Sequence, residues 1–103
     1  MSTLFNPKLM VLDLEAYTVT EVLTRLSNRV FTEGYVKESF TQAILERETE
    51  FSTGLPGLGR GVAIPHADPE HVNASVIAVG ILRNPVQFKM MGNHDETIDV
   101  EVV

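Results

Sequence analysis

One short stretch concentrates the residues that can do chemistry. In "GVAIPHADPEH", Gly61 to His71, an apolar run typical of a strand reaches Pro65, and His66 follows at once. A neutral imidazole is a good nucleophile and titrates near physiological pH. Reacting groups tend to lie on loops that a rigid sheet positions. His66 is therefore a candidate nucleophile, and the alternative is a histidine that only ends a strand.

The loop before this strand favours an anion. "STGLPGLGRG", Ser52 to Gly61, contains four glycines and offers backbone N–H groups and two hydroxyls. Successive N–H groups in such turns form concave sites for phosphate. No Gly-Lys-Ser/Thr ends the stretch, so it is not a Walker A loop and nucleotide binding is not expected. The alternative is a plain flexible loop.

Arg47 precedes this loop and is the natural partner for a phosphoryl group. A guanidinium presents paired N–H donors that match phosphoryl oxygens. The alternative is a solvated helix charge that pairs with a neighbouring acid: Glu46, Glu48 or Glu50.

A metal centre is a further alternative. His66, Asp68 and His71 provide two imidazoles and a carboxylate, which a catalytic zinc can use. However, Pro69 breaks helical register between them, and His94 is far along the chain. We therefore expect no metal site.

Two helices must position these groups. Thr18 and Glu21 fit a capping box, and apolar residues then recur at helical spacing, which predicts a helix over 19–33. Gly34 is a typical C-terminal cap. The next apolar period predicts a second helix over 37–49.

Strands follow the helices. The pattern predicts a strand or extended segment at 9–14, a short strand at 61–65, an apolar strand at 74–82, a turn and short extended piece at 84–88, a polar loop at 90–96 and an alternating strand at 97–103. Two helices followed by several strands predict an α/β sandwich.

Composition limits the function classes. The 103 residues predict one domain over 1–103, and eight Lys and Arg against fourteen Asp and Glu give a net charge of −6. Such a chain is repelled by nucleic acid and by anionic membranes, so neither is an expected partner. No apolar run has the length of a membrane span, and no signal peptide is expected. The absence of cysteine excludes disulfides and fits a cytoplasmic location.

Together these motifs resemble a known family. "EVLTRLSNRVFTEGYVKESFTQAILERETEFSTGL", "GVAIPHAD" and "VIAVGILRNPVQF" resemble the enzyme IIA domain of the bacterial phosphoenolpyruvate-dependent sugar phosphotransferase system, in its fructose–mannitol superfamily. "F-x-T-G-L" and "H-x-D-x-E-H-V" are most similar to the galactitol branch. The resemblance extends from about Leu4 to Val103, and implies a mixed β-sheet sandwiched with α-helices.

The resemblance also implies a mechanism. His66 would accept a phosphoryl group from the phosphocarrier protein HPr on Nε2, while Nδ1 keeps its proton and donates it to a backbone carbonyl. The group would then pass to a cysteine of the IIB component during sugar uptake. Arg47 and Thr53 would stabilise the phosphoryl group, and Leu55 and Leu58 would help partners to dock. No cofactor is implied.

The chain departs from the family pattern in two places. Ser52 replaces the proline often found before "T-G-L". The family domain continues beyond the position of Val103, so we expect the chain to lack the family's C-terminal part. An apolar face left uncovered would be buried in a homo-oligomer or by strand exchange. The competing function is a IIA-like regulatory module, phosphorylated to signal sugar supply and without a role in transport.

Overall fold

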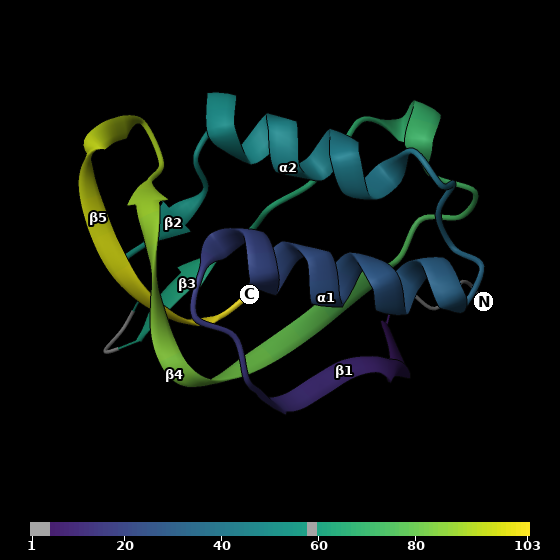
Figure 1. Cartoon of the computed structure of the whole chain (residues 1–103), viewed down its shortest axis with the longest axis horizontal. Helices are drawn as coiled ribbons and strands as arrows, with labels where there is room; N and C mark the ends of the chain where they lie inside the picture. The colour runs from purple at the N-terminus through teal and green to yellow at the C-terminus, as the bar shows by residue number, and fades with distance from the viewer. Residues whose placement is uncertain (1–4, 58–59) are drawn as a thin grey trace.

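The computed structural model of the chain describes residues 5–57 and 60–103 (Figure 1). Its elements are β1 (Phe5–Leu14), α1 (Val19–Thr32), α2 (Phe40–Glu50), β2 (Gly54–Leu55), β3 (Gly61–Ala63), the 3₁₀ helix η1 (Pro69–His71), β4 (Ile77–Met90) and β5 (Asn93–Val102). The strands form one mixed sheet in the order β1-β4-β2-β3-β5, and β4 also pairs with β5. The predicted α/β class is thus confirmed.

The long strand β4 organises the sheet. It pairs in parallel with β1 and with β2, and antiparallel with β5. Since β2 pairs with β3 and β3 with β5, the four strands β4, β2, β3 and β5 form a closed circuit of pairings. The short strands β2 and β3, which lead to His66, are therefore held on both sides by longer ones.

Helix α1 forms as the sequence predicts. The Oγ1 of Thr18 accepts the backbone N–H of Glu21 at 3.1 Å, which confirms the N-terminal cap. Gly34 follows the C-terminal end at a φ of +86°, a conformation that glycine adopts without strain. Val22, Leu23 and Leu26 are buried on the face that packs against β1 and β4.

Helix α2 begins at Phe40, three residues later than predicted. The backbone N–H of Lys37 donates to the carbonyl of His71 at 2.8 Å, and Val36 forms an isolated bridge with Val72. These contacts keep Val36 and Lys37 out of the helix, and a turn at 38–39 leads into it. The helical period in the sequence does not reveal a tertiary contact of this kind.

The predicted turn at 84–88 is wrong, because β4 continues through Asn84 and Pro85. The pairing of β4 with β5 shifts register between Ile81 and Val86, and the residues between them include an exposed run at 83–85. Pro85 has no N–H to pair, and an irregular stretch of this kind tolerates it. The strand bends here without reversing its direction.

The predicted polar loop at 90–96 is also mostly strand. Only Met91 and Gly92 form the turn, with Gly92 at a φ of +77°, and β5 begins at Asn93. Gly92 thus permits a tight hairpin in place of a loop. The predicted alternation further along β5 is present, with Val100 fully buried and Asp99 exposed.

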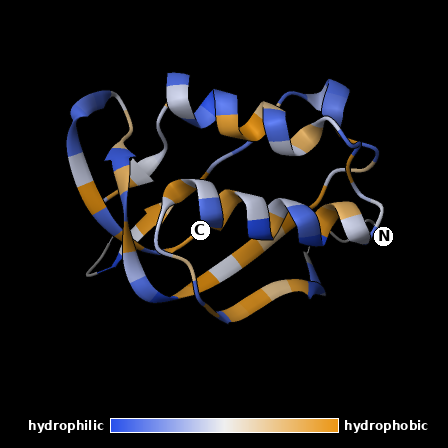
Figure 2. Ribbon diagram, in the orientation of Figure 1, coloured by the Kyte–Doolittle hydropathy of each residue, from blue (hydrophilic) through white to orange (hydrophobic). Residues whose placement is uncertain are grey.

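The core lies between α1 and the sheet. Figure 2 shows hydrophobic residues concentrated along β1 and the first half of β4, below α1, and α2 packs against α1. The main cluster consists of Leu14, Ala16, Val22, Leu26, Ala63, Leu82, Val86, Phe88, Val100 and Val103. Ala63, the last residue of β3, belongs to it, so the core anchors the strand that carries the candidate nucleophile. Over the described ranges, no helix is long and apolar enough to cross a membrane.

Candidate functional site

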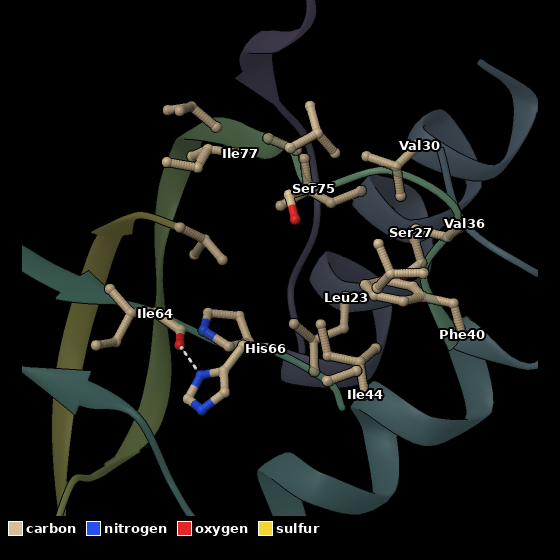
Figure 3. A pocket seen from close by; sticks show the side chains of 18 of the residues that line it. Leu23, Ser27, Val30, Val36, Phe40, Ile44, Ile64, His66, Ser75 and Ile77 are labelled. Carbon is tan, nitrogen blue, oxygen red and sulfur yellow. Dashed lines mark hydrogen bonds between the residues drawn. The ribbon is translucent and has the colours of Figure 1, made fainter. Parts of the chain in front are cut away.

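His66 lies three residues after the end of β3 and is exposed to solvent. Its Nδ1 lies 2.9 Å from the carbonyl oxygen of Ile64 (Figure 3). A carbonyl oxygen only accepts hydrogen bonds, so Nδ1 carries the proton and Nε2 keeps its lone pair. This is the arrangement that a nucleophilic Nε2 requires.

Backbone geometry explains how Ile64 holds the ring. β3 ends at Ala63, two residues earlier than predicted, and the N–H of Ile64 still donates to the carbonyl of Thr53 at 3.3 Å. Pro65 has no N–H and cannot continue the ladder. The N–H of Thr53, which faces Ile64 across the ladder, donates to Glu48 at 2.9 Å, so the carbonyl of Ile64 is available for His66.

Arg47 lies in the last turn of α2 and faces the residues just after His66. Its Nη1 is 3.4 Å from Oδ1 of Asp68, and its guanidinium carbon is 5.3 Å from the centroid of the Phe51 ring. Its Nε is buried and has no hydrogen-bond partner among the described residues. Within that part of the chain, no hydrogen bond or ion pair joins Arg47 to His66 itself.

A small cavity of about 260 Å³ lies between the end of α2 and the segment after His66. It is lined by Ala43, Glu46, Arg47, Glu50, Phe51, Ala67, Asp68 and His71. The lining combines one guanidinium with three carboxylates. A bound anion would therefore interact favourably with Arg47 and be repelled by the neighbouring acids.

Thr53 is buried, and its hydroxyl is not free. The Oγ1–H donates to Oε1 of Glu48 at 2.8 Å, and the hydroxyl of Ser52 donates to the carbonyl of Met90 at 2.7 Å. Both hydroxyl protons of the loop are used inside the protein. This differs from the expectation that these hydroxyls face an anion.

The glycines of this loop serve close packing. An ideal Cβ on Gly61 would lie 2.0 Å from the backbone oxygen of Asp99, and one on Gly54 would lie 2.7 Å from the backbone oxygen of Lys89. Glycine is thus needed where β2 and β3 approach β4 and β5. The structure therefore gives these two glycines a packing role in place of the predicted anion-binding one.

Glu48 is the site residue that the sequence did not reveal. It appeared there only as a neighbour of Arg47, but the residue is 8% exposed and its carboxylate accepts the N–H and the hydroxyl of Thr53. Burial raises its pKa, while the hydrogen bonds from Thr53 and the charges of His66 and His94 lower it. Glu48 follows the buried Ile44 by four positions, so helical spacing alone could have placed it on the inner face.

The metal alternative finds no support in the described part of the chain. There, no group of three His, Asp or Glu side chains lies close enough to hold a metal ion. His71 is directed elsewhere, because its Nδ1 lies 2.8 Å from the hydroxyl of Ser39.

An apolar groove of about 750 Å³ begins beside His66. Figure 3 shows side chains of α1 and α2, including Phe40 and Ile44, opposite Ile64, His66 and Ile77. Ile64 is 47% exposed and was not among the predicted docking residues.

Of the two leucines predicted to help docking, one can be placed. Leu55 lies in β2 and is half-buried. Leu58 lies outside the described residues, so its part in docking stays a prediction.

The chain is similar in sequence to a PTS component and to a transcriptional regulator. It is 33% identical over 84 residues to the PTS system galactitol-specific EIIA component of Escherichia coli (strain K12), covering 82% of this chain and 55% of that protein. It is 30% identical over 83 residues to the transcriptional regulator ManR of Bacillus subtilis (strain 168), covering 81% of this chain and 12% of that protein.

Solved structures agree with this similarity. The chain resembles the crystal structure of a PTS IIA (PtxA) from Streptococcus mutans, with a TM-score of 0.72 and 28% identity. It also resembles that of a PTS IIA domain from Streptococcus pyogenes M1 GAS, with a TM-score of 0.71 and 25% identity. Each match covers 90% of this chain and 56% of the solved chain, so this chain spans little more than half the length of these relatives.

A family-wide comparison covers nearly the whole chain. Residues 3–103 match the family described as "Phosphoenolpyruvate-dependent sugar phosphotransferase system, EIIA 2". The galactitol-specific relative and the likeness of the fold to solved PTS IIA domains agree with that match. The chain therefore belongs to the EIIA 2 family of the phosphoenolpyruvate-dependent sugar phosphotransferase system.

Proposed function

We propose that the chain is a phosphoryl carrier, in which His66 accepts a phosphoryl group from phospho-HPr and passes it to a cysteine of a IIB component. The observation that carries the proposal is the 2.9 Å contact between Nδ1 of His66 and the carbonyl of Ile64, which leaves the Nε2 lone pair exposed. The family and the galactitol-specific relative support a galactitol-like polyol as the transported sugar. The transfers would take place in the cytoplasm.

Each transfer exchanges one bond to phosphorus for another. In the first, the Nε2 lone pair of His66 attacks phosphorus, and the bond to HPr breaks with its electron pair remaining on HPr. The phosphorylated ring then carries both the Nδ1 proton and positive charge, which the Ile64 carbonyl dipole stabilises. In the second, a cysteine thiolate of IIB attacks phosphorus, and the Nε2–P electron pair returns to His66.

Arg47 stabilises the transferring group in this proposal. Phosphoryl transfer depends mainly on positioning and on donors for the three phosphoryl oxygens. Arg47 has a buried Nε with no partner among the described residues, and its contact with Asp68 is long and partly exposed. Moving the guanidinium from Asp68 to a phosphoryl group costs little, because such surface pairs contribute about 0–1 kcal/mol.

Partners dock transiently around His66 in this proposal. The exposed Ile64 and the adjacent apolar groove supply apolar surface of the kind found at the centre of protein interfaces. Leu55 and Leu58 keep their proposed role in docking, beside HPr and then IIB.

The experiment that tests the proposal is phosphorylation by purified components. The chain is incubated with phosphoenolpyruvate, enzyme I and HPr, and the product is examined by mass spectrometry for an acid-labile phosphoryl group. We expect label on His66, none in His66→Ala, and label retained in His71→Ala, whose imidazole is held by Ser39. Label on another residue, or none on a folded protein, would overturn the carrier role.

A regulatory role is the second candidate, and the similarity to ManR favours it. Both roles use the same phosphorylated His66, so the second transfer discriminates between them. A carrier passes its label to the cysteine of a galactitol-type IIB protein, and chasing labelled protein with IIB measures this directly. Label that remains on His66 would favour the regulatory module.

A further inference from the structure

A buried acid is linked to His66 by a chain of hydrogen bonds. Glu48 accepts the backbone N–H of Thr53 on Oε2 at 2.9 Å and its hydroxyl on Oε1 at 2.8 Å. A single side chain thus holds both donors of one residue. Glu48 is only 8% exposed, and burying a carboxylate is unfavourable unless such bonds compensate.

The hydrogen bonds continue from Thr53 to the imidazole. The carbonyl of Thr53 accepts the N–H of Ile64 at 3.3 Å, and the carbonyl of Ile64 accepts Nδ1–H of His66 at 2.9 Å. Thr53 and Ile64 extend the antiparallel pairing of β2 and β3 by one residue pair. The path from Glu48 to His66 therefore crosses one short ladder and runs through the backbone of Thr53 and Ile64.

The ladder ends at Thr53 and Ile64. β2 has two residues and β3 has three, and Pro65 donates no hydrogen bond. The 3.3 Å bond between Thr53 and Ile64 is long. The residues on either side of Thr53 are bonded to the end of β4 and to the turn after it, but both donors of Thr53 itself go to Glu48. Without Glu48 these two donors lose their partner, so we expect Thr53 to shift and the carbonyl of Ile64 to shift with it.

We propose that Glu48 is a positioning residue for His66: by holding both donors of Thr53, it fixes the Ile64 carbonyl that keeps the His66 proton on Nδ1. This role rests on the proposed phosphoryl transfer for its purpose, but the tautomer itself is a property of the unphosphorylated protein. Glu48 does not touch the reacting atoms.

The test combines nitrogen NMR of His66 with the rate of phosphorylation. In the wild-type protein we expect the tautomer with the proton on Nδ1. In Glu48→Ala we expect a mixture of both tautomers and a rate about ten- to hundredfold lower, as a displaced reacting group produces. Glu48→Gln should restore both readouts to within about tenfold, because its amide oxygen still accepts the Thr53 N–H and its NH₂ donates to the Thr53 hydroxyl.

Two controls keep this test decisive. Ser52→Ala removes a hydroxyl bond from the neighbouring residue, off the path, and should leave the His66 tautomer unchanged. If Glu48→Ala does not fold, Glu48→Asp, whose shorter side chain cannot reach both donors equally, replaces it and should give the same mixture. A folded Glu48 variant with the wild-type tautomer and rate would overturn the positioning role. A wild-type protein that shows the Nδ1–H tautomer but takes no label would overturn the carrier role instead.

Discussion

Arg47 and Asp68 form an ion pair beside the candidate nucleophile, with Nη1 and Oδ1 3.4 Å apart. Asp68 lies two residues after His66, so its carboxylate competes with a phosphoryl group for the same guanidinium. The pair is one third exposed on the Arg47 side and two thirds on the Asp68 side, and such pairs are weak.

Asp68→Asn should accelerate phosphorylation of His66. Removing the competing carboxylate frees Arg47, and a surface pair worth at most about 1 kcal/mol limits the gain to about fivefold. The initial rate with phospho-HPr checks this. Glu70→Gln removes a nearby acid that does not contact Arg47, so it controls for net charge. A tenfold loss in folded Asp68→Asn would show that Asp68 itself takes part.

Arg47→Gln should slow phosphorylation by about 10²- to 10³-fold, as the loss of one donor to a developing charge does in other enzymes. Arg60→Gln is the matched control, because Arg60 is exposed, precedes β3 and pairs with Glu101 at 3.5 Å. It removes the same charge from the same region. Equal losses in the two variants would mean that overall charge, and not the placement of Arg47, governs the rate.

The stability of the protein should depend on Glu48 in a pH-dependent way. Burial raises the pKa of Glu48 above its ordinary value of 4.5, so the folded state retains a proton that the unfolded state releases. The contribution is therefore fully present below pH 4.5 and is lost as the pH rises through the folded pKa. Glu48→Gln does not titrate. Its free energy of unfolding, relative to wild type, should rise by about 1.4 kcal/mol for each pH unit between the two pKa values.

Urea unfolding of both proteins at several pH values measures this difference. The other acids are common to both proteins, so their contributions cancel in the comparison. A difference that falls as the pH rises would mean that the hydrogen bonds from Thr53 and the nearby histidines outweigh burial.

An exposed charge network joins the end of β1 to the middle of β4. Arg83 on β4 donates to both carboxylate oxygens of Asp13, at 3.0 and 2.9 Å, and also contacts Glu15. The hydrogen bond from Arg83 lowers the pKa of Asp13, so this stabilisation is present above pH 3.8 and is lost as the pH falls through the lowered pKa. Arg83→Gln should therefore lower the unfolding midpoint slightly at pH 7 and in low salt, and this effect should shrink as the pH falls through the lowered pKa of Asp13. A midpoint difference that persists unchanged in 1 M salt would contradict this.

The sequence predicted those parts of the fold that depend on local pattern. Helix α1 has a cap, an apolar period and a terminal glycine, and each of these is a local signal. The start of α2 and the course of β4 through Pro85 depend on partners distant in sequence. A pattern read along the chain does not contain those partners, and these two predictions were wrong for that reason.

In the site, too, local features could be predicted from the sequence and tertiary contacts could not. The exposed position of His66 just after a short strand could be predicted from the Pro65 that precedes it, which is a local feature; its role as nucleophile stays a prediction. Glu48 was missed because neighbouring acids suggested a surface charge, although its spacing of four from Ile44 indicates the inner face of α2. Its bonds to Thr53 are contacts that the helical pattern does not contain. The glycines at 54 and 61 suggested an anion site, but the structure shows strands that approach each other closely.

The glycine at 61 provides the last prediction. A methyl group there would lie 2.0 Å from the backbone oxygen of Asp99, so β3 would have to separate from β5. At Gly80 an added methyl meets only side-chain methyls of Leu26 and Leu14, at 3.1 to 3.3 Å, and these can move. Gly61→Ala should therefore cost about 3 kcal/mol or more, against about 1 kcal/mol for Gly80→Ala. Urea unfolding measures the free energy of unfolding of both variants. Because β3 leads directly to His66, Gly61→Ala should also lose the Nδ1–H tautomer of His66, while Gly80→Ala should retain it. Equal costs would show that β3 has room at this point.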